Sequence, residues 1–321
     1  MLIPAAIVWI AGCAAHTGEN SLPMETPESF SAGGAAPMPE KWWTVFGDDE
    51  LNIMIDSALQ SNFNLRSAWQ RLKAARAVVD RESSSLFPDL EGFISGDVNR
   101  SRQEILTYES LSLGLASSYE IDLWGRISSA IDAEEFRAEA ELSDYRAAAI
   151  SLSAEIVRTR YRLIEARKKL EIIDGQVETN QKVLDLLKSR FGSGQIRRVD
   201  ILRQRQFLES TREQKAYAES NVRILENQLA VLMGRTPQEG VDISAGELPE
   251  LLGMPESGVP SELIQRRPDV RSAFNLLQAA DRDLASAISN QYPRLSISAS
   301  VSTVADDNDV LFENWAYSLA G

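Results

Sequence analysis

Between residues 127 and 191 the chain carries two lanes of mostly hydrophobic side chains, each returning every seven positions. This a/d spacing is typical of a helix that packs along a seam against other helices. At about 1.5 Å per residue, such a helix is a rod on the order of 100 Å long. The first lane contains Leu142, Ala149, Ile156, Leu163, Leu170, Val177, Leu184 and Phe191, and the second Tyr145, Leu152, Thr159, Ala166, Ile173, Asn180 and Leu187.

Gly192-Ser193-Gly194 interrupts this pattern, and a second heptad helix is predicted from residue 197 to residue 233. Gly234 and Pro237 mark its end. The two helices therefore form an antiparallel hairpin whose outgoing arm is the longer, with ~40 Å of unpaired seam. A third predicted helix, 48–86, has the same heptad frame and a suitable length. We therefore expect one long helix to lie beside two shorter helices stacked end to end.

The chain contains an internal repeat. Arg66-Ser67-Ala68 matches Arg271-Ser272-Ala273 at an offset of 271 − 66 = 205, and the same offset pairs Phe87-Pro88 with Tyr292-Pro293. Each copy begins with a predicted heptad helix, 48–86 in the first and 261–288 in the second. Both helices should stop before the aromatic-proline pair, because proline disfavours the helical conformation in the residue before it. This agreement indicates a duplicated unit.

Each predicted helix is followed by strands that alternate apolar and small polar residues. The pattern suits either a soluble sandwich or a membrane barrel with lipid outside and water inside. Four strands cannot close a barrel, and open edges are not tolerated in lipid, so a barrel would need several chains. The apolar positions are Leu90, Ile94 and Val98; Leu111, Leu113, Leu115, Tyr119 and Ile121; Leu295, Ile297, Ala299 and Val301; and Trp315, Tyr317 and Leu319.

The second repeat stops at Gly321, within its predicted fourth strand. By analogy with the first repeat it would continue into another long helix and hairpin. We therefore expect the chain to be C-terminally truncated, either as a fragment or naturally.

Composition narrows the function. The net charge of −14 and sequence pI near 4.7 argue against a nucleic-acid partner. The chain has one cysteine, Cys13, and one histidine, His16, so neither a disulfide, a cysteine metal cluster nor a histidine-based catalytic triad is expected in the folded body. We therefore expect no enzyme activity, no metal and no cofactor. No run of 18 apolar residues follows the N-terminal leader, so no spanning helix is expected.

The N-terminal leader is a short apolar block, residues 2–10, followed by Ile10-Ala11-Gly12-Cys13. The block is too short to span a membrane and precedes small residues, as in a secretory signal peptide. These four residues resemble the lipobox of bacterial lipoproteins, which implies acylation of Cys13, including palmitate. The polar, Pro- and Gly-rich segment that follows has the composition of a flexible tether.

Three longer segments resemble one protein family. Residues 41–51 (KWWTVFGDDEL), 119–126 (YEIDLWGR) and 263–271 (LIQRRPDVR) are similar to the entry motif, the strand-to-helix junction and the second-repeat start of TolC-like outer-membrane efflux proteins. With the lipobox, the chain resembles the lipoprotein branch of this family, the outer-membrane factors of resistance–nodulation–division type tripartite efflux systems. Arg190-Phe191 with Gly194 resembles the family's hairpin tip.

The resemblance implies an α+β, mostly α fold: a long antiparallel coiled-coil helical barrel in the periplasm, plus four strands per chain in a trimeric transmembrane β-barrel. It implies a homotrimer in outer-membrane lipid, lipid-anchored through Cys13, that works with a periplasmic adaptor (membrane fusion) protein and an inner-membrane efflux transporter. The adaptor would meet the hairpin tip, formed by Arg190, Phe191, Gly192, Gly194, Gln195, Ile196, Arg197 and Arg198. Together with Lys188, Arg203 and Arg205 the tip arginines form a basic collar on an acidic chain, which favours an acidic adaptor surface.

The expected organisation is a signal peptide (1–12), a lipidated tether (13–47), the first-repeat upper helix (48–88), barrel strands one and two (89–122), the long helix, tip and return helix (123–235), an equatorial linker (236–260), the second-repeat helix (261–292) and barrel strands three and four (293–321). Trp42, Trp43 and Trp124 are expected to anchor helix starts by packing. Asp122 is expected to act as a cap or turn acid at the strand-to-helix junction and not as a catalytic carboxylate.

The predicted function is an outer-membrane efflux channel that passively conducts small molecules, drugs or metal ions, from the periplasm to the outside. The alternative is a periplasmic coiled-coil lipoprotein with a structural or adaptor role, whose strands form a soluble module.

Overall fold

A computed structural model describes residues 39–100, 107–239, 246, 248–250, 253, 260–305, 312 and 314–321 of the chain. Within them the chain forms two compact units. The helical unit contains residues 39–70 and 145–267, and the sheet unit contains residues 71–144 and 268–321. The predicted signal peptide, most of the tether and most of the equatorial linker lie outside the described residues.

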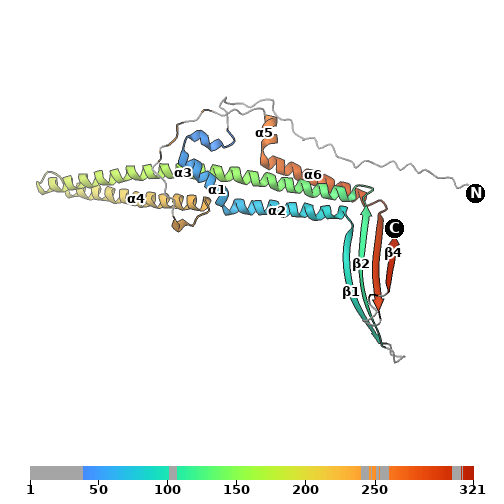
Figure 1. The fold of residues 1–321 in the computed structure, drawn as a ribbon. Helices are drawn as coiled ribbons and strands as arrows, with labels where there is room; N and C mark the ends of the chain where they lie inside the picture. Colours follow the sequence, from blue (N-terminus) through green and yellow to red (C-terminus); the bar gives the residue numbers. More distant parts are fainter. Residues whose placement is uncertain are drawn as a thin grey trace, which may run out of the picture. The chain divides into compact units, whose positions relative to one another are not determined.

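The helical unit is built on the long helix α3 (Arg126–Gly192), whose later part belongs to it, and on the return helix α4 (Arg198–Leu232), which runs antiparallel to α3 (Figure 1). Both helices lie within one residue of their predicted bounds. The predicted lanes form the seam: Ile156, Leu163 and Leu184 of α3 are buried, as are Leu208 and Leu229 of α4. The heptad prediction is therefore confirmed.

The core of the helical unit lies where three helices meet. The helix α1 (Asp49–Ser61) packs with the end of α4 against the middle of α3, and the short 3-10 helix η1 (Trp42–Phe46) caps this contact. Trp42 donates its indole N–H to the Ser153 hydroxyl at 3.2 Å, and Trp43 is buried. The expected anchoring role of these tryptophans is confirmed. The core contains Trp43, Leu51, Met54, Ile55, Ala58, Leu65, Leu152, Ile156, Val157, Leu163, Ala166, Val222, Leu225, Leu229 and Met233.

The prediction of one continuous helix over residues 48–86 is wrong. The chain forms α1 and a second helix, α2 (Phe63–Ser83), separated by the extended residue Asn62 and followed by the 3-10 helix η2 (Ser84–Leu86). The buried Asn62 accepts the amide of Leu65 at 3.0 Å and donates to the carbonyl of Leu232 at 2.9 Å. It thus starts α2 and ties the α1–α2 junction to the end of α4. The expected end-to-end contact between the two shorter helices is present, but it requires this break.

The predicted continuous helix 261–288 is also wrong. It divides into α5 (Pro260–Arg266) and α6 (Pro268–Ser289) at Arg267. Pro268 supplies no amide hydrogen and disfavours helix in the residue before it, and its fixed φ suits the first turn of a new helix. Arg267 closes α5 by donating its amide to the carbonyl of Leu263 at 3.0 Å. A 3-10 turn, η3 (Pro237–Glu239), follows α4.

The sheet unit contains four antiparallel strands in sequence order: β1 (Asp89–Arg100), β2 (Thr107–Ile121), β3 (Leu295–Ala305) and β4 (Trp315–Ala320) (Figure 1). The four predicted strands are confirmed. The later part of α2 leads into β1, and α6 leads into β3, so both repeats place a helix before a strand pair. None of the helices in the described residues is long and apolar enough to cross a bilayer.

Candidate functional site

The hairpin tip is a tight turn formed by the residues predicted for it. Gly194 adopts a φ of +76°, a conformation that favours glycine. Its amide donates to the carbonyl of Phe191 at 2.9 Å, and the amide of Gln195 donates to the carbonyl of Arg190 at 3.0 Å. This pair of hydrogen bonds is the Schellman motif, which satisfies the last carbonyls of a helix. The glycine therefore fixes where α3 ends.

The start of α4 is fixed by Asp200. Its carboxylate accepts the amide of Arg197 at 3.1 Å, and its own amide donates to the carbonyl of Arg197 at 3.0 Å. A carboxylate in the first turn also interacts favourably with the positive end of the helix dipole. Only three residues separate the α3 end at Gly192 from the half-buried Ile196, so the turn has little freedom.

The tip presents basic and apolar side chains together. Lys188 pairs with Asp185 at 2.9 Å, and this partner holds the pKa of Asp185 below its usual value. Within the described part of the chain, the tip arginines form no ion pair and are exposed. Exposed apolar residues lie among them. The tip arginines are Arg190, Arg197, Arg198, Arg203 and Arg205, and the apolar residues are Phe191, Val199 and Leu202.

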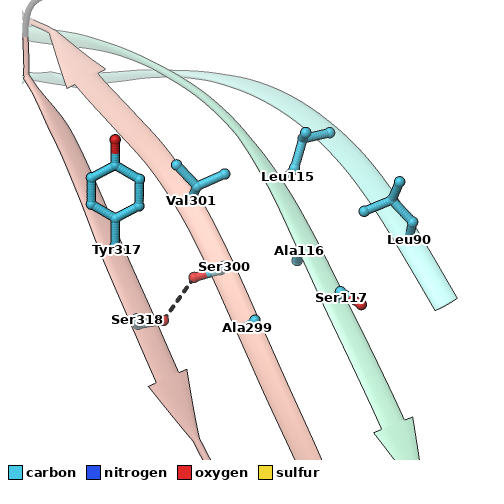
Figure 2. A pocket seen from close by; sticks show the side chains of 9 residues that line it. All are labelled: Leu90, Leu115, Ala116, Ser117, Ala299, Ser300, Val301, Tyr317 and Ser318. Carbon is cyan, nitrogen blue, oxygen red and sulfur yellow. Dashed lines mark hydrogen bonds between the residues drawn. The ribbon is translucent and has the colours of Figure 1, made fainter. Parts of the chain in front are cut away.

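The sheet has one apolar face. The register places Leu115, Val301 and Tyr317 in one row across three strands, and Leu90 of β1 faces the same side. Figure 2 shows these four side chains, one from each strand. They are not covered by the chain: Leu90 is 73% exposed and Tyr317 is 78% exposed. Over residues 90–98, 111–121, 295–305 and 315–319, this face contains Leu90, Gly92, Ile94, Gly96 and Val98; Leu111, Leu113, Leu115, Ser117, Tyr119 and Ile121; Leu295, Ile297, Ala299, Val301, Thr303 and Ala305; and Trp315, Tyr317 and Leu319.

The opposite face is lined by small polar residues. The hydroxyls of Ser95 and Ser112 form a hydrogen bond at 2.7 Å between β1 and β2, and those of Ser300 and Ser318 form one at 2.8 Å between β3 and β4 (Figure 2). The charged residues that the described register places on this face are acids: Asp89, Glu91, Asp97 and Glu120. Face by face, the sheet thus separates lipid-compatible from water-compatible side chains.

Within the described residues, neither long edge of the sheet is paired. β1 and β4 are the terminal strands of the order β1-β2-β3-β4, and each has one row of backbone groups directed away from the sheet. Such edges are templates for pairing with further strands. The apolar face and the two terminal strands are thus the parts of the sheet that remain available for further contacts.

The junction between β2 and α3 is held by polar contacts. The Asp122 carboxylate accepts the amides of Ile127 (3.1 Å) and Ser128 (2.8 Å) and the Ser128 hydroxyl (2.7 Å), which confirms its role as a cap. Burial alone would raise the pKa of Asp122, but these hydrogen bonds outweigh it and hold the pKa below its ordinary value. Trp124 stacks on Tyr292 with ring centroids 4.9 Å apart and donates to the carbonyl of Pro293, so its expected packing role is also confirmed.

Sequence reasoning missed two residues. Phe93 of β1 lies on the polar face of the sheet, opposite Gly114, and the signal was an aromatic residue in an otherwise polar lane. Arg160 of α3 is 2% exposed and paired with Asp48 and Glu50. No pattern in the sequence indicates that this arginine is buried, because a charged residue beside a heptad lane normally faces water. The predicted lipidation site, Cys13, lies outside the described residues.

No group of three or more metal-ligating side chains is present in the described residues. The candidate site is therefore a set of surfaces: the hairpin tip in one unit and the two-faced sheet in the other. A two-faced, edge-open antiparallel sheet and a long coiled-coil hairpin are features of a channel-forming membrane protein.

A family model described as "Outer membrane efflux protein" matches residues 54–235, more than half of the chain. The protein belongs to this family. It is 27% identical to the pyoverdine export outer membrane protein OpmQ of Pseudomonas aeruginosa over 92% of this chain and 67% of that protein. It is 25% identical to the cation efflux system protein CusC of Escherichia coli over 94% of this chain and 68% of that protein. The chain spans about two thirds of the length of the curated relatives it matches.

The fold is that of solved outer-membrane channels. The structure of the channel OprN superposes with a TM-score of 0.81 at 25% sequence identity, covering 96% of this chain and 72% of that one. The predicted fold class, mostly α with a four-stranded antiparallel sheet, and the family resemblance are confirmed.

Proposed function

We propose that the protein is the outer-membrane channel component of a tripartite efflux system and passively conducts small molecules from the periplasm to the outside. The observation that carries the proposal is the strand register. It gathers exposed apolar residues on one face and serines and acids on the other, in a sheet whose two terminal strands have no further partner strand among the described residues. A water-soluble module would not leave such a face uncovered.

The height of the apolar face supports a membrane-spanning position. On β3 it runs from Leu295 to Ala305, ten residue steps. At about 3.3 Å per step, it is ~33 Å long along the strand. With a strand tilt of about 40°, its height is ~25 Å, which is the height of the apolar band in outer-membrane barrels.

The strand count supports assembly of several copies. A closed barrel needs at least about eight strands, and one copy supplies four. Three copies give 3 × 4 = 12 strands, and each β1 edge then pairs with the β4 edge of the next copy. The protein is accordingly proposed to be a homotrimer, with outer-membrane lipid on the apolar face and water on the serine face.

Cysteine crosslinking tests the assembly. Ser95→Cys on β1 is combined in turn with Ala316→Cys, Ser318→Cys and Ala320→Cys on β4, all on the polar face. At least one pair should give covalently linked species of two and three copies in the outer-membrane fraction. The control pair is Ser95→Cys with Ser302→Cys on the inner strand β3, which should not link copies.

Membrane extraction separates the channel from its alternative. A channel stays in the outer membrane after its lipid anchor is removed and resists extraction by carbonate. A periplasmic coiled-coil lipoprotein would be released when the anchor is cleaved and would give no intercopy crosslinks. Release of the anchor-free protein together with absent crosslinks would refute the channel proposal.

The hairpin tip is proposed to contact a periplasmic adaptor protein, which links the channel to an inner-membrane transporter. In support, Arg190, Arg197 and Arg198 are exposed without ion pairs in the described residues, beside exposed Phe191 and Val199. Apolar anchors surrounded by unpaired charges are typical of transient protein interfaces, where charge raises the rate of association.

Charge reversal tests the tip. The double variant Arg197→Glu/Arg198→Glu should weaken adaptor crosslinking and efflux. Lys182→Glu is a matched control because Lys182 is a basic residue on exposed α3 surface, paired within its own helix to Glu178. Crosslinking that is unchanged in the double variant, or equally reduced in the control, would show that Arg197 and Arg198 do not contribute to the adaptor interface.

Cys13 is proposed to carry the lipid anchor, on the basis of its lipobox-like sequence. Metabolic labelling with a radioactive palmitate should label the protein, and Cys13→Ser should abolish the label. If the Cys13→Ser protein is still labelled, the lipid is attached to a residue other than Cys13.

The cargo is proposed to be small molecules, drugs or metal ions, carried without catalysis. Relatives are named for the export of pyoverdine, toluene and cations, so the family scaffold is compatible with chemically different cargoes. The pump and adaptor are then expected to select the cargo, and the channel to conduct it.

A further inference from the structure

Phe93 is an aromatic residue on the serine-lined face of the sheet. The register pairs it with Gly114 of β2, which in turn pairs with Ser302 of β3. Phe93 remains 37% exposed although its ring lies against Gly114. In the proposed channel this face lines the water-filled interior, where an exposed aromatic ring has no solvation advantage.

The position of the ring is fixed by the missing side chain of Gly114. A Cβ atom at Gly114 would lie 2.6 Å from Cζ and 2.9 Å from Cε1 of Phe93. These distances are shorter than real Cβ contacts, so the ring occupies space that any other residue would fill. Phe93 is therefore held against β2, and the remainder of the ring stays accessible.

Carboxylates on the same strand face give this ring a negative surrounding. Glu91 lies two residues before Phe93 and Asp97 four residues after it, ~7 Å and ~13 Å along the strand. Both are exposed and have no basic partner within the described part of the chain. Asp89 differs, because its carboxylate accepts the amide of Ser118 at 2.7 Å.

We propose that Phe93, with Glu91, forms a binding site for organic cations that have an apolar or aromatic body. The ring supplies apolar contact and a negative π face for the cation, and the Glu91 carboxylate complements its charge. Each copy contributes one such site to the wall of the conduction path. This inference rests on the proposed channel function, because that function places the serine face in the interior.

A simpler role for Phe93 is to shield the glycine backbone, as aromatic residues do for glycines in neighbouring strands. Phe93→Leu separates the two roles, because leucine still covers Gly114 but has no π face. The thermal stability of Phe93→Leu reports the shielding role, and ligand interaction reports the binding role.

The test is channel block in planar lipid bilayers by tetraphenylphosphonium, with tetraphenylborate as the anion of the same shape. Block is measured relative to the unblocked conductance of each variant. Tetraphenylphosphonium should block the unaltered protein, and Phe93→Leu should raise the half-blocking concentration about fivefold, as expected for loss of one cation–π contact. Glu91→Gln should raise it by a smaller factor. The control Ser302→Ala, on the same face, should not change it.

Equal half-blocking concentrations in Phe93→Leu and the unaltered protein would overturn the site, as would equal block by the borate anion. If the purified protein gives no conductance, the channel proposal fails by itself. Binding is then measured by saturation-transfer NMR with benzyltrimethylammonium and benzenesulfonate. Signal for the cation that Phe93→Leu reduces would retain the site, and signal that it leaves unchanged would reject it.

Discussion

Replacing Arg160 with methionine should make local opening of α1, the first helix of the helical unit, more frequent. Arg160 is 2% exposed within α3. Its Nε donates to Asp48 Oδ2 at 2.7 Å, and its Nη2 donates to Asp48 Oδ1 at 3.2 Å and to Glu50 Oε2 at 2.9 Å. Burial alone would lower the pKa of Arg160, but these carboxylates raise it above its ordinary value, so the guanidinium stays charged.

The size of the effect follows from the two carboxylates, Asp48 and Glu50, that lose the guanidinium charge. Removing one member of a buried ion pair costs about 3–5 kcal/mol. The side chains of Asp48 and Glu50 keep 20% and 31% exposure, so water compensates part of the loss. We expect about 3 kcal/mol, at the low end of that range. At about 1.4 kcal/mol per factor of ten, local opening of α1 then increases roughly a hundredfold.

Amide hydrogen exchange of α1 measures this opening directly. Arg160→Met should speed exchange at Leu51 and Ile55 about a hundredfold. The triple variant Arg160→Met/Asp48→Asn/Glu50→Gln should recover most of the protection, because it removes the two carboxylate charges that the guanidinium compensated and asparagine still caps α1.

A matched surface control is Arg212→Met, whose partner Glu209 lies at 3.0 Å with both side chains about half exposed. Exposed pairs contribute well under about 1 kcal/mol, so α1 exchange should not change. Unchanged exchange in Arg160→Met, or a triple variant no better protected than the single one, would refute the reasoning.

Three further changes should lower stability by separate mechanisms. Asp122→Asn should lower the melting temperature at pH 7, but the difference should narrow as pH falls through and below 3.8, because a carboxylate with a lowered folded-state pKa stabilises only while it is ionised. Asn62→Ala should cost ~2 kcal/mol in urea unfolding, since it removes the α2 cap and the bond to the Leu232 carbonyl. Gly234→Ala should cost ~2 kcal/mol or more in the same assay, because φ is +72° and the new Cβ would lie 2.5 Å from the Ser61 carbonyl oxygen.

Each of these three stability predictions has its own control. A melting difference for Asp122→Asn that is constant from pH 7 to pH 3 would show that charge is not the cause. Asn62→Ser keeps a neutral cap oxygen but loses the amide donor, so it should lose less stability than Asn62→Ala. For Gly234, the control Gly175→Ala lies in open space within α3 and should be neutral or stabilising, and equal losses at both glycines would contradict the steric argument.

The sequence by itself determined the elements whose signals are local. The seven-residue repeat predicted the long helix and its partner to within one residue, because helical periodicity is encoded by side chains of the same helix face. The alternation of apolar and polar residues predicted the four strands, because successive side chains of a strand point to opposite faces of the sheet. The positive φ at the hairpin tip favours glycine, so Gly194 indicated the position of the turn in the sequence.

The tertiary structure decided the features that depend on distant partners. The heptad frame runs unbroken through Asn62, and only the Leu232 carbonyl shows why the helix stops there. The burial of Arg160 depends on carboxylates 110 and 112 residues away. The location of Phe93 over Gly114 depends on the strand register, since a shift of one residue would move the ring to the opposite face. Local periodicity fixes which side chains share a face, but the long-range pairing determines which way that face points and what it meets.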